Sequence, residues 1–281
     1  MLDYNILSNK LQQLNTYRPL SKVEVDELNR QMKIEHIWSS NAIEGNSLTR
    51  YETESVLANG MTISSKPIKD ALEAIDLSEA YDFVKDLATN DTPLSMRDMR
   101  DINRLVTLKT TERPEIAGAI RDIEVWPNGF PKDTYAEPSQ IPEKLAEFIS
   151  WYNTTDDHPV LKATKAHAKF VTIHPFIDGN GRASRLLMNF TLMRAGYPII
   201  NIQPDVDARL YYMKSLQQYS QNHDINQFEQ LIYNEVNTNL DERISILQNR
   251  ELEISKAREE TNLPPSFFDN SSQDDYSSPS F

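Results

Sequence analysis

The chain has 281 residues, of which 39% are hydrophobic and 25% charged, as is usual for a globular protein with one large domain or two modest ones. It has no cysteine, which excludes disulfides and thiolate chemistry. Its net charge of −13 argues against nonspecific nucleic-acid binding, and no apolar run is long enough for a membrane helix. The N-terminus lacks the features of a secretory signal, so we expect a cytoplasmic protein that binds neither nucleic acid nor membrane.

Helical periodicity dominates the first hundred residues. Thr49 and Glu52 have the spacing of a capping box, and Ser95 is placed to cap a later helix. Apolar residues recur every three to four positions between such signals. The helices expected here run from a cap at Ser21 to Gly45-Asn46, from Thr49 to Asn59-Gly60, over residues 68–88 and over residues 96–108.

One segment departs from this pattern. Ile120, Ile123 and Val125 favour strands, and Pro127-Asn128-Gly129 has turn chemistry, which predicts a β-hairpin over Gly118–Phe130. Helices resume after it, over residues 140–151, from Pro159 to Ile173, and over residues 182–195, 207–221 and 226–259. We therefore expect an all-α fold with one β-hairpin.

Glycine is scarce, with seven residues, yet two stand one residue apart in the run His174-Pro175-Phe176-Ile177-Asp178-Gly179-Asn180-Gly181-Arg182. A Gly-x-Gly before a helix lets main-chain N–H groups turn toward a bound anion. Asn180, between the glycines, is placed to donate its amide to a phosphate oxygen. Taken alone, a motif this short is more often a plain connection between helices.

The neighbouring residues supply the other parts of a phosphate-transfer site. Arg182 and Arg185 share one helical face, and their charges oppose the helix dipole unless both meet an anion. Asp178 would repel phosphates unless a Mg²⁺ lies between them. His174 is suited to accept a proton at neutral pH. Together these residues predict phosphoryl or nucleotidyl transfer.

The segment from His174 to Arg185 resembles the signature of the Fic family, His-Pro-Phe-x-(Asp/Glu)-Gly-Asn-Gly-Arg-x-x-Arg, at each defined position. The resemblance covers roughly Ile75 to Tyr233 and implies a helical fold with one β-hairpin. It also implies an adenylyltransferase that moves AMP from Mg-ATP to a Ser, Thr or Tyr hydroxyl of a target protein.

The resemblance implies a role for each residue of the motif. His174 is the expected base for the target hydroxyl, and Asp178 the expected ligand of a Mg²⁺ that bridges the α- and β-phosphates. Arg185 is expected to meet the γ-phosphate. Tyr212 is expected in the adenine pocket, although the segment after it is one residue longer than the family pattern. The α- and β-phosphates are expected at Gly179, Asn180, Gly181 and Arg182.

Two further segments resemble other parts of the family. Ser40-Asn41-Ala42-Ile43-Glu44-Gly45 resembles the inhibitory motif (Ser/Thr)-x-x-x-Glu-(Gly/Asn). Ser40 and Glu44 share one helical face, so Glu44 can pair with Arg185 and compete with the γ-phosphate. The Gly118–Phe130 hairpin resembles the flap on which a target segment docks by main-chain pairing. The alternatives are a solvated helix end and a hairpin without a partner.

The expected organisation follows from these assignments. It comprises an N-terminal helical region with the inhibitory motif (residues 1–74), a catalytic core (75–233), a C-terminal helix (234–260) and a tail rich in Pro, Ser, Asn, Asp and Gln (261–281) that we expect to be disordered.

Other functions remain open. Transfer of UMP or of a phosphate group is disfavoured, because Doc-type relatives have lysine in the region where this chain keeps Gly181-Arg182. Removal of AMP, with Glu44 positioning a water, and a non-catalytic ATP-responsive regulator are further alternatives. His167 is a structural histidine in preference to a second catalytic one. Self-modification and a homo-oligomer are compatible with the sequence.

Overall fold

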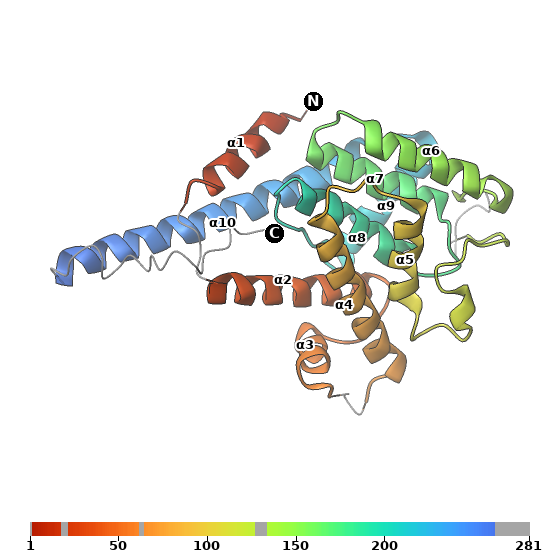
Figure 1. The fold of residues 1–281 in the computed structure, drawn as a ribbon, viewed down its shortest axis with the longest axis horizontal. Helices are drawn as coiled ribbons and strands as arrows, with labels where there is room; N and C mark the ends of the chain where they lie inside the picture. The colour runs from red at the N-terminus through yellow and green to blue at the C-terminus, as the bar shows by residue number, and fades with distance from the viewer. Residues whose placement is uncertain (1, 18–21, 62–64, 127–133, 262–281) are drawn as a thin grey trace.

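The computed structural model describes residues 2–17, 22–61, 65–126 and 134–261. Across these ranges the regular secondary structure is helical (Figure 1). The α-helices are α1 (Tyr4–Leu14), α2 (Lys22–Ile43), α3 (Arg50–Asn59), α4 (Ile68–Ala88), α5 (Met96–Thr107), α6 (Ile141–Thr154), α7 (Pro159–Ile173), α8 (Asn180–Arg194), α9 (Val206–Asn222) and α10 (Asn226–Thr261). The short 3-10 helices η1 (Pro114–Ile116) and η3 (Pro138–Gln140) flank the predicted hairpin. The mainly helical fold is confirmed.

Two helices begin as their capping patterns predict. At the start of α3, the Thr49 hydroxyl accepts a hydrogen bond from the N–H of Glu52, whose carboxylate accepts one from the N–H of Thr49. Ser95 and Asp98 make the same reciprocal pair at the start of α5. Each box gives partners to N–H groups that the first turn of a helix leaves unpaired. The predicted starts of both helices are confirmed.

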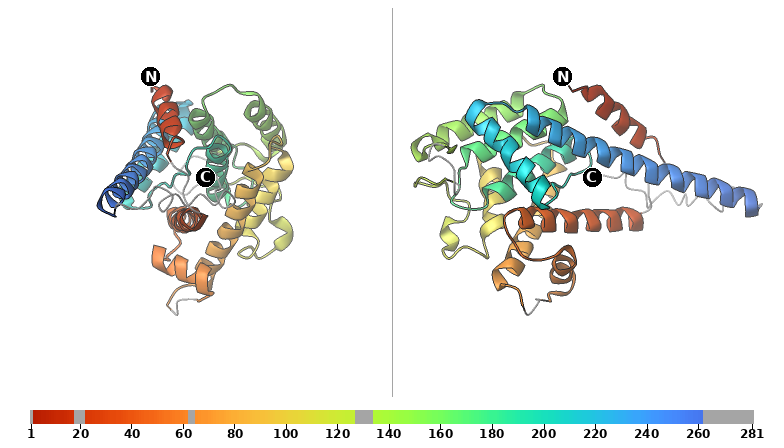
Figure 2. Two further views of the ribbon diagram at one scale, coloured as in Figure 1. Left: turned by 60° about the vertical axis from the view of Figure 1, so that its left-hand side comes forward. Right: turned by 180° about the vertical axis from the view of Figure 1, so that it is seen from behind.

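Helix α1 is absent from the sequence-based prediction. Asp3 caps it, and the helix buries Leu7 and Leu14 completely or nearly so. It lies beside α10 (Figures 1 and 2), where the Lys10 ammonium pairs with Asp241. An eleven-residue helix is marginal by itself, so packing against α10 stabilises it.

The β-hairpin predicted over Gly118–Phe130 is wrong where the structure describes it, because residues 118–126 form no strand. Their main chain finds partners outside any sheet. The N–H of Arg121 donates to the carbonyl of Pro175 at 2.9 Å. The N–H of Gly118 donates to the side-chain carbonyl of Asn103 at 3.2 Å. Residues with strand propensity therefore run as an irregular segment over the helices. The rest of the predicted hairpin lies outside the described residues.

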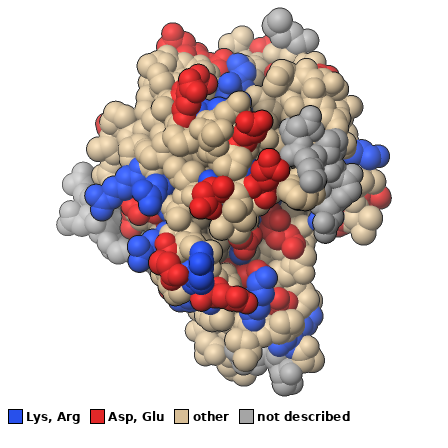
Figure 3. Space-filling view, turned by 90° about the vertical axis from the view of Figure 1, so that its right-hand side faces the viewer, with Lys and Arg blue, Asp and Glu red and all other residues tan. Residues whose placement is uncertain are grey.

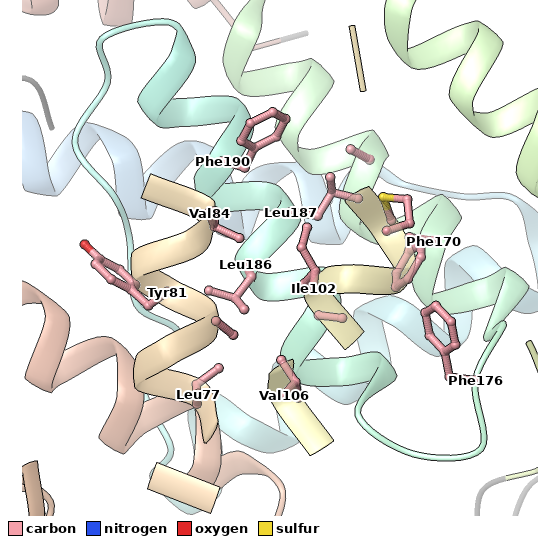
Figure 4. Close-up of a cluster of buried hydrophobic side chains, with 14 of the residues drawn as sticks. Leu77, Tyr81, Val84, Ile102, Val106, Phe170, Phe176, Leu186, Leu187 and Phe190 are labelled. Carbon is pink, nitrogen blue, oxygen red and sulfur yellow. The ribbon is translucent and has the colours of Figure 1, made fainter. Parts of the chain in front are cut away.

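Helix α8 occupies the centre of the molecule and is buried along most of its length. Leu186 and Phe190 pack into a cluster with side chains from α4, α5, α6 and α7 (Figure 4). Met188 and Leu192 pack into a second cluster with α1, α7, α9 and α10. A helix held on all sides cannot tilt without opening both clusters. The N-terminus of α8 is thereby fixed in space.

Helix α10 continues without a break across residues 233–234, where the sequence suggested a change from core to C-terminal helix. Its C-terminal part extends beyond the rest of the protein (Figure 1). Within the described ranges, no helix is both long and apolar enough to cross a membrane.

The surface carries charges of both signs. On the face shown in Figure 3, Lys and Arg side chains form separate groups among acidic ones. This mixture agrees with a chain in which 42 Asp and Glu outnumber 29 Lys and Arg.

Candidate active site

The loop between α7 and α8 is held in one conformation. Its first residue, His174, is left-handed (φ 50°), and its last, Gly179, is too (φ 78°). Helix α8 then begins at Asn180, two residues earlier than predicted. The Asn180 amide accepts from the N–H of Phe176 at 3.0 Å and donates to the carbonyl of Phe176 at 2.8 Å. The side chain expected on a phosphate thus braces the loop, which leaves main-chain N–H groups at the start of α8 to face an anion.

Gly179 is required for two reasons. Its positive φ suits glycine, and a Cβ here would lie 2.7 Å from the Thr107 methyl and 2.9 Å from the Asn103 amide. That same Asn103 amide donates to the carbonyl of Asp178 at 2.8 Å. Helix α5 therefore packs against the loop through Asn103 and Thr107.

The imidazole of His174 is oriented from two sides. Its Nδ1 lies 3.2 Å from the carbonyl of Val171, and its ring stacks on Tyr135 with centroids 3.7 Å apart and planes at 11°. Because a carbonyl only accepts, this contact places the proton on Nδ1 and leaves the Nε2 lone pair free. Burial lowers the pKa of His174 to about 4, although the Val171 contact opposes the shift. The ring is therefore a neutral base at pH 7.

Asp178 is the only motif carboxylate in the loop, and its side chain is 66% exposed. One oxygen accepts from the N–H of Gly179 at 2.6 Å, and the other lies 3.3 Å from Arg182. No cluster of three metal-ligating side chains occurs in the part of the chain that the structure describes. One exposed carboxylate fits a Mg²⁺ held jointly with nucleotide phosphates, which is how this ion commonly binds.

Arg182 is 3% exposed and offers buried donors to a ligand. Its Nη2 contacts Asp178, and its Nη1 lies 3.8 Å from Glu73. Its Nε and Nη1 are buried without a hydrogen-bond partner among the described residues. Buried donors of this kind are costly unless something accepts from them, and phosphate oxygens would do so.

Arg185, in contrast, has its donors filled. Its Nε and Nη2 donate to the hydroxyl and the carbonyl of Ser40, both at 2.8 Å. Its Nη2 also donates to Glu44 at 2.7 Å, and its Nη1 donates to the Tyr212 hydroxyl at 3.2 Å. Both ends of the Ser40–Glu44 motif thus meet the arginine that the sequence assigned to the γ-phosphate.

Glu44 follows the last residue of α2 and stays 42% exposed. Loss of water around the carboxyl raises its pKa, but the charge and hydrogen bond of Arg185 outweigh this and hold the pKa below its usual value. The carboxylate is therefore ionised at neutral pH and forms a charge-assisted pair with Arg185.

A cavity of about 120 Å³ brings some of the expected site residues together, whereas Ser40, Asp178, Gly179, Asn180 and Arg182 are not among its lining residues. Tyr212 is buried behind it, and its hydroxyl contacts both Arg185 and the fully buried His167. His167 also meets the Ser184 hydroxyl at 3.2 Å, as a structural histidine would. The lining includes Glu44, His174, Gly181, Arg185, Tyr212 and the apolar side chains of Val171, Met213 and Leu216. Charged groups at one side and apolar groups at the other suit a nucleotide.

Three residues near the site escaped the sequence-based prediction. Arg121 donates to the carbonyl of His174, Tyr135 stacks on its ring, and Asn103 supports Asp178. Each lies some 40 to 75 positions from its partner, and nothing in the local pattern marks it.

Comparison with known proteins places this site in a family. Residues 93–192 match the model of the Fic/DOC family. The chain is 33% identical over 190 residues to the protein adenylyltransferase Fic of Drosophila grimshawi, which is 66% of this chain and 38% of the relative. It is 34% identical over 181 residues to protein adenylyltransferase fic-1 of Caenorhabditis briggsae, which is 63% of this chain and 35% of the relative. The chain therefore spans less than two fifths of these curated relatives.

Solved structures give the same result. Fic-1 from C. elegans superposes with a TM-score of 0.76 at 26% identity, covering 88% of this chain and 73% of that chain. A Fic domain containing signaling protein from Bacteroides thetaiotaomicron superposes with a TM-score of 0.76 at 27% identity, covering 87% and 97%. The fold and the site define a Fic domain. The protein is a member of the Fic family.

Proposed function

We propose that the protein is an adenylyltransferase that moves AMP from Mg-ATP to a hydroxyl of a target protein and is held inactive by Glu44. The observation that carries the proposal is that His174, a half-buried base that is neutral at pH 7, lies in the same loop and helix start as the buried Arg182 and Arg185. The curated relatives named above are protein adenylyltransferases, which supports the same activity.

The chemistry that this arrangement supports is an in-line displacement at phosphorus. The target hydroxyl oxygen attacks the α-phosphorus while its proton passes to Nε2 of His174. The bond between the α-phosphorus and the bridging oxygen breaks, and pyrophosphate leaves. Arg182 and the N–H groups at the start of α8 neutralise and orient the phosphates, which is the main contribution a protein makes to such a transfer.

Asp178 is the residue that would hold Mg²⁺ together with the α- and β-phosphates. Its carboxylate is exposed and lies beside the phosphate donors of Arg182. The ion would supply charge neutralisation to the nucleotide. The target protein would dock beside residues 118–126, which contact the loop through the hydrogen bond from the N–H of Arg121 to the carbonyl of Pro175.

Inhibition by Glu44 follows from competition for Arg185. The Glu44 carboxylate already accepts a hydrogen bond from the Arg185 guanidinium, which the γ-phosphate would need as a donor. ATP can then bind only with its phosphates displaced from the in-line position. Release of Glu44 would restore that position.

Two labels test the proposal. The protein, and its Glu44→Gly variant, would be incubated with a native lysate and with ATP labelled at the α- or at the γ-phosphate. Transfer of the α label alone supports adenylylation. Transfer of the γ label would indicate phosphorylation, and no transfer of either label by Glu44→Gly would favour a non-catalytic regulator.

Removal of AMP is a second candidate function, because Glu44 and His174 line the same cavity. The exposed part of the Glu44 carboxylate could orient a water toward a phosphorus atom. Incubation of pre-labelled target with wild type and with Glu44→Gly separates the two activities. Release of AMP by the wild type alone would favour removal.

A further inference from the structure

Arg121 has an unusual environment for an arginine. It is 3% exposed, and its guanidinium donates to three main-chain carbonyls. Nε donates to His174 at 2.7 Å, Nη1 to Ile123 at 2.7 Å and Nη2 to Ala136 at 2.5 Å. These carbonyls belong to three separate stretches of chain, so a single planar side chain ties them together.

No carboxylate in the described part of the chain forms an ion pair with Arg121. Glu124 favours the charge only at a distance, and a buried guanidinium without a direct ion pair is costly, so apolar side chains could fill the same volume at lower cost. The carbonyl dipoles compensate only part of that cost. The residue therefore needs an explanation beyond packing.

The first of the three carbonyls belongs to the base itself. His174 is left-handed (φ 50°, ψ 60°), a conformation that is unfavourable for a residue with a side chain. Arg121 makes two hydrogen bonds to this turn. Its side chain donates to the carbonyl of His174, and its main-chain N–H donates to the carbonyl of Pro175 at 2.9 Å. The side-chain bond to His174 is the one that a substitution of Arg121 removes, and without it the turn that aims the ring keeps only the main-chain bond at Pro175.

The third carbonyl, of Ala136, adjoins the residue that stacks on the imidazole. Tyr135 covers one face of the His174 ring, and it lines both the nucleotide cavity and an open neighbouring cavity of about 540 Å³. Arg121 therefore fixes the backbone of the base and also the segment that carries the ring against it.

We propose that Arg121 is a positioning residue for His174, which it aims by clamping the left-handed turn and the Tyr135 segment to the loop. The proposal rests on the proposed role of His174 as base. Loss of the clamp leaves the phosphate donors of Arg182 and of the N-terminus of α8 in place and misdirects Nε2 away from the target hydroxyl.

The test compares Arg121→Met and Arg121→Lys with Arg100→Met, all in the Glu44→Gly background so that transfer is measurable. Arg100 is a matched control, because its Nε donates to the carbonyl of Gly118 at 2.9 Å without contacting His174. Transfer from α-labelled ATP, the Kd for ATP and the 15N spectrum of histidine-labelled protein would be recorded. The chain has five histidines, so His174→Gln identifies the relevant signals.

Arg121→Met should lower kcat by about 10- to 100-fold while the Kd for ATP changes less than about twofold, since only orientation is lost. The imidazole signals of His174 should shift, and its pKa should rise, because burial and the Arg121 charge both lower it and the charge is now removed. Arg121→Lys keeps the charge but cannot span three carbonyls, so kcat should fall with a smaller change in pKa.

Spectra and kcat of both Arg121 variants equal to those of Arg100→Met would overturn the proposal. If Arg121→Met does not fold, Arg121→Lys alone decides the outcome. The spectra need no turnover, so absence of transfer in every variant would count against the proposed function, whereas unshifted His174 signals would count against the clamp.

Discussion

The carboxylate of Glu44 packs against the backbone of Gly181. A Cβ added to Gly181 would lie 2.1 Å from Glu44 Oε1. The φ of Gly181 is not positive, so close approach explains the glycine. The second glycine of the motif thus gives room to the Glu44 carboxylate, which we propose to be inhibitory.

Gly181→Ala should act with opposite sign in two backgrounds. In the wild type, the added methyl displaces Glu44 from Arg185 and should lower the free energy of unfolding by about 1–3 kcal/mol. In Glu44→Gly the nearest remaining atom is Nη1 of Arg185, at 3.3 Å from the added Cβ, and alanine in a helix should be neutral or stabilising by up to about 1 kcal/mol. Urea unfolding of the four proteins measures both changes. Equal changes in the free energy of unfolding in the two backgrounds would contradict the close contact between Glu44 and Gly181.

The pH dependence of transfer should reflect the lowered pKa of His174. The base acts when deprotonated, and burial lowers its pKa to about 4. The acid limb of kcat for Glu44→Gly should therefore lie near pH 4 instead of near the ordinary histidine value of about 6.5. His174→Ala should abolish transfer and leave ATP binding within a few-fold. An acid limb at pH 6 to 7 would contradict a buried neutral base.

Much of the fold and of the loop could be predicted because the signals are local. Thr49 with Glu52, and Ser95 with Asp98, fix helix starts within four residues, and α4, α7 and α9 lie within one residue of prediction. Scarce glycines beside arginines marked the anion site. Helix α1 was missed because it forms through contact with α10, far along the chain.

The remaining features depend on tertiary contacts that no local pattern encodes. Strand propensity in residues 118–126 is overridden because Arg121 and Pro175 pair outside a sheet. Asn180 could be assigned to phosphate from spacing, but the loop folds so that Phe176 takes its amide. Whether a donor faces a ligand or its own loop depends on a turn geometry that the sequence leaves undetermined.

Several histidines with lowered pKa values predict a pH-dependent stability. Burial lowers the pKa of His36 and of His174 to about 4, that of His167 well below its usual value, and that of His158 in the same direction. Between these values and about 6.5 the unfolded chain binds protons that the folded protein does not, so stability should fall as pH drops below 6.5. The slope should approach about 1.4 kcal/mol per pH unit for each histidine. Denaturant unfolding at pH 7.0, 6.0 and 5.2 measures it.

His36→Gln should reduce the slope of this pH dependence. A free energy of unfolding that stays constant from pH 7.0 to 5.2 would contradict neutral burial of these histidines.

Asp178→Ala should weaken ATP binding only when Mg²⁺ is present. The exposed carboxylate is the candidate protein ligand of the ion, and its removal leaves the phosphates with the arginines alone. In EDTA the variant should bind ATP as well as the wild type or better, since a negative charge has been removed. Isothermal titration in Mg²⁺ and in EDTA measures the difference. Identical affinities of both proteins in both buffers would refute the metal assignment.

Glu44→Gly should raise transfer of α-labelled AMP well above the wild type. Glu44 occupies Nη2 of Arg185 at 2.7 Å, so removing the carboxylate frees the guanidinium for the γ-phosphate. Because the carboxylate is 42% exposed, water weakens the pair, and we expect roughly 5- to 30-fold activation. Adding Arg185→Ala should abolish the gain, because the freed partner is then missing. Ser40→Ala should activate less than Glu44→Gly, since the Ser40 carbonyl still accepts from Arg185. Labelling by Glu44→Gly equal to or below that of the wild type would show that the pair does not restrain transfer.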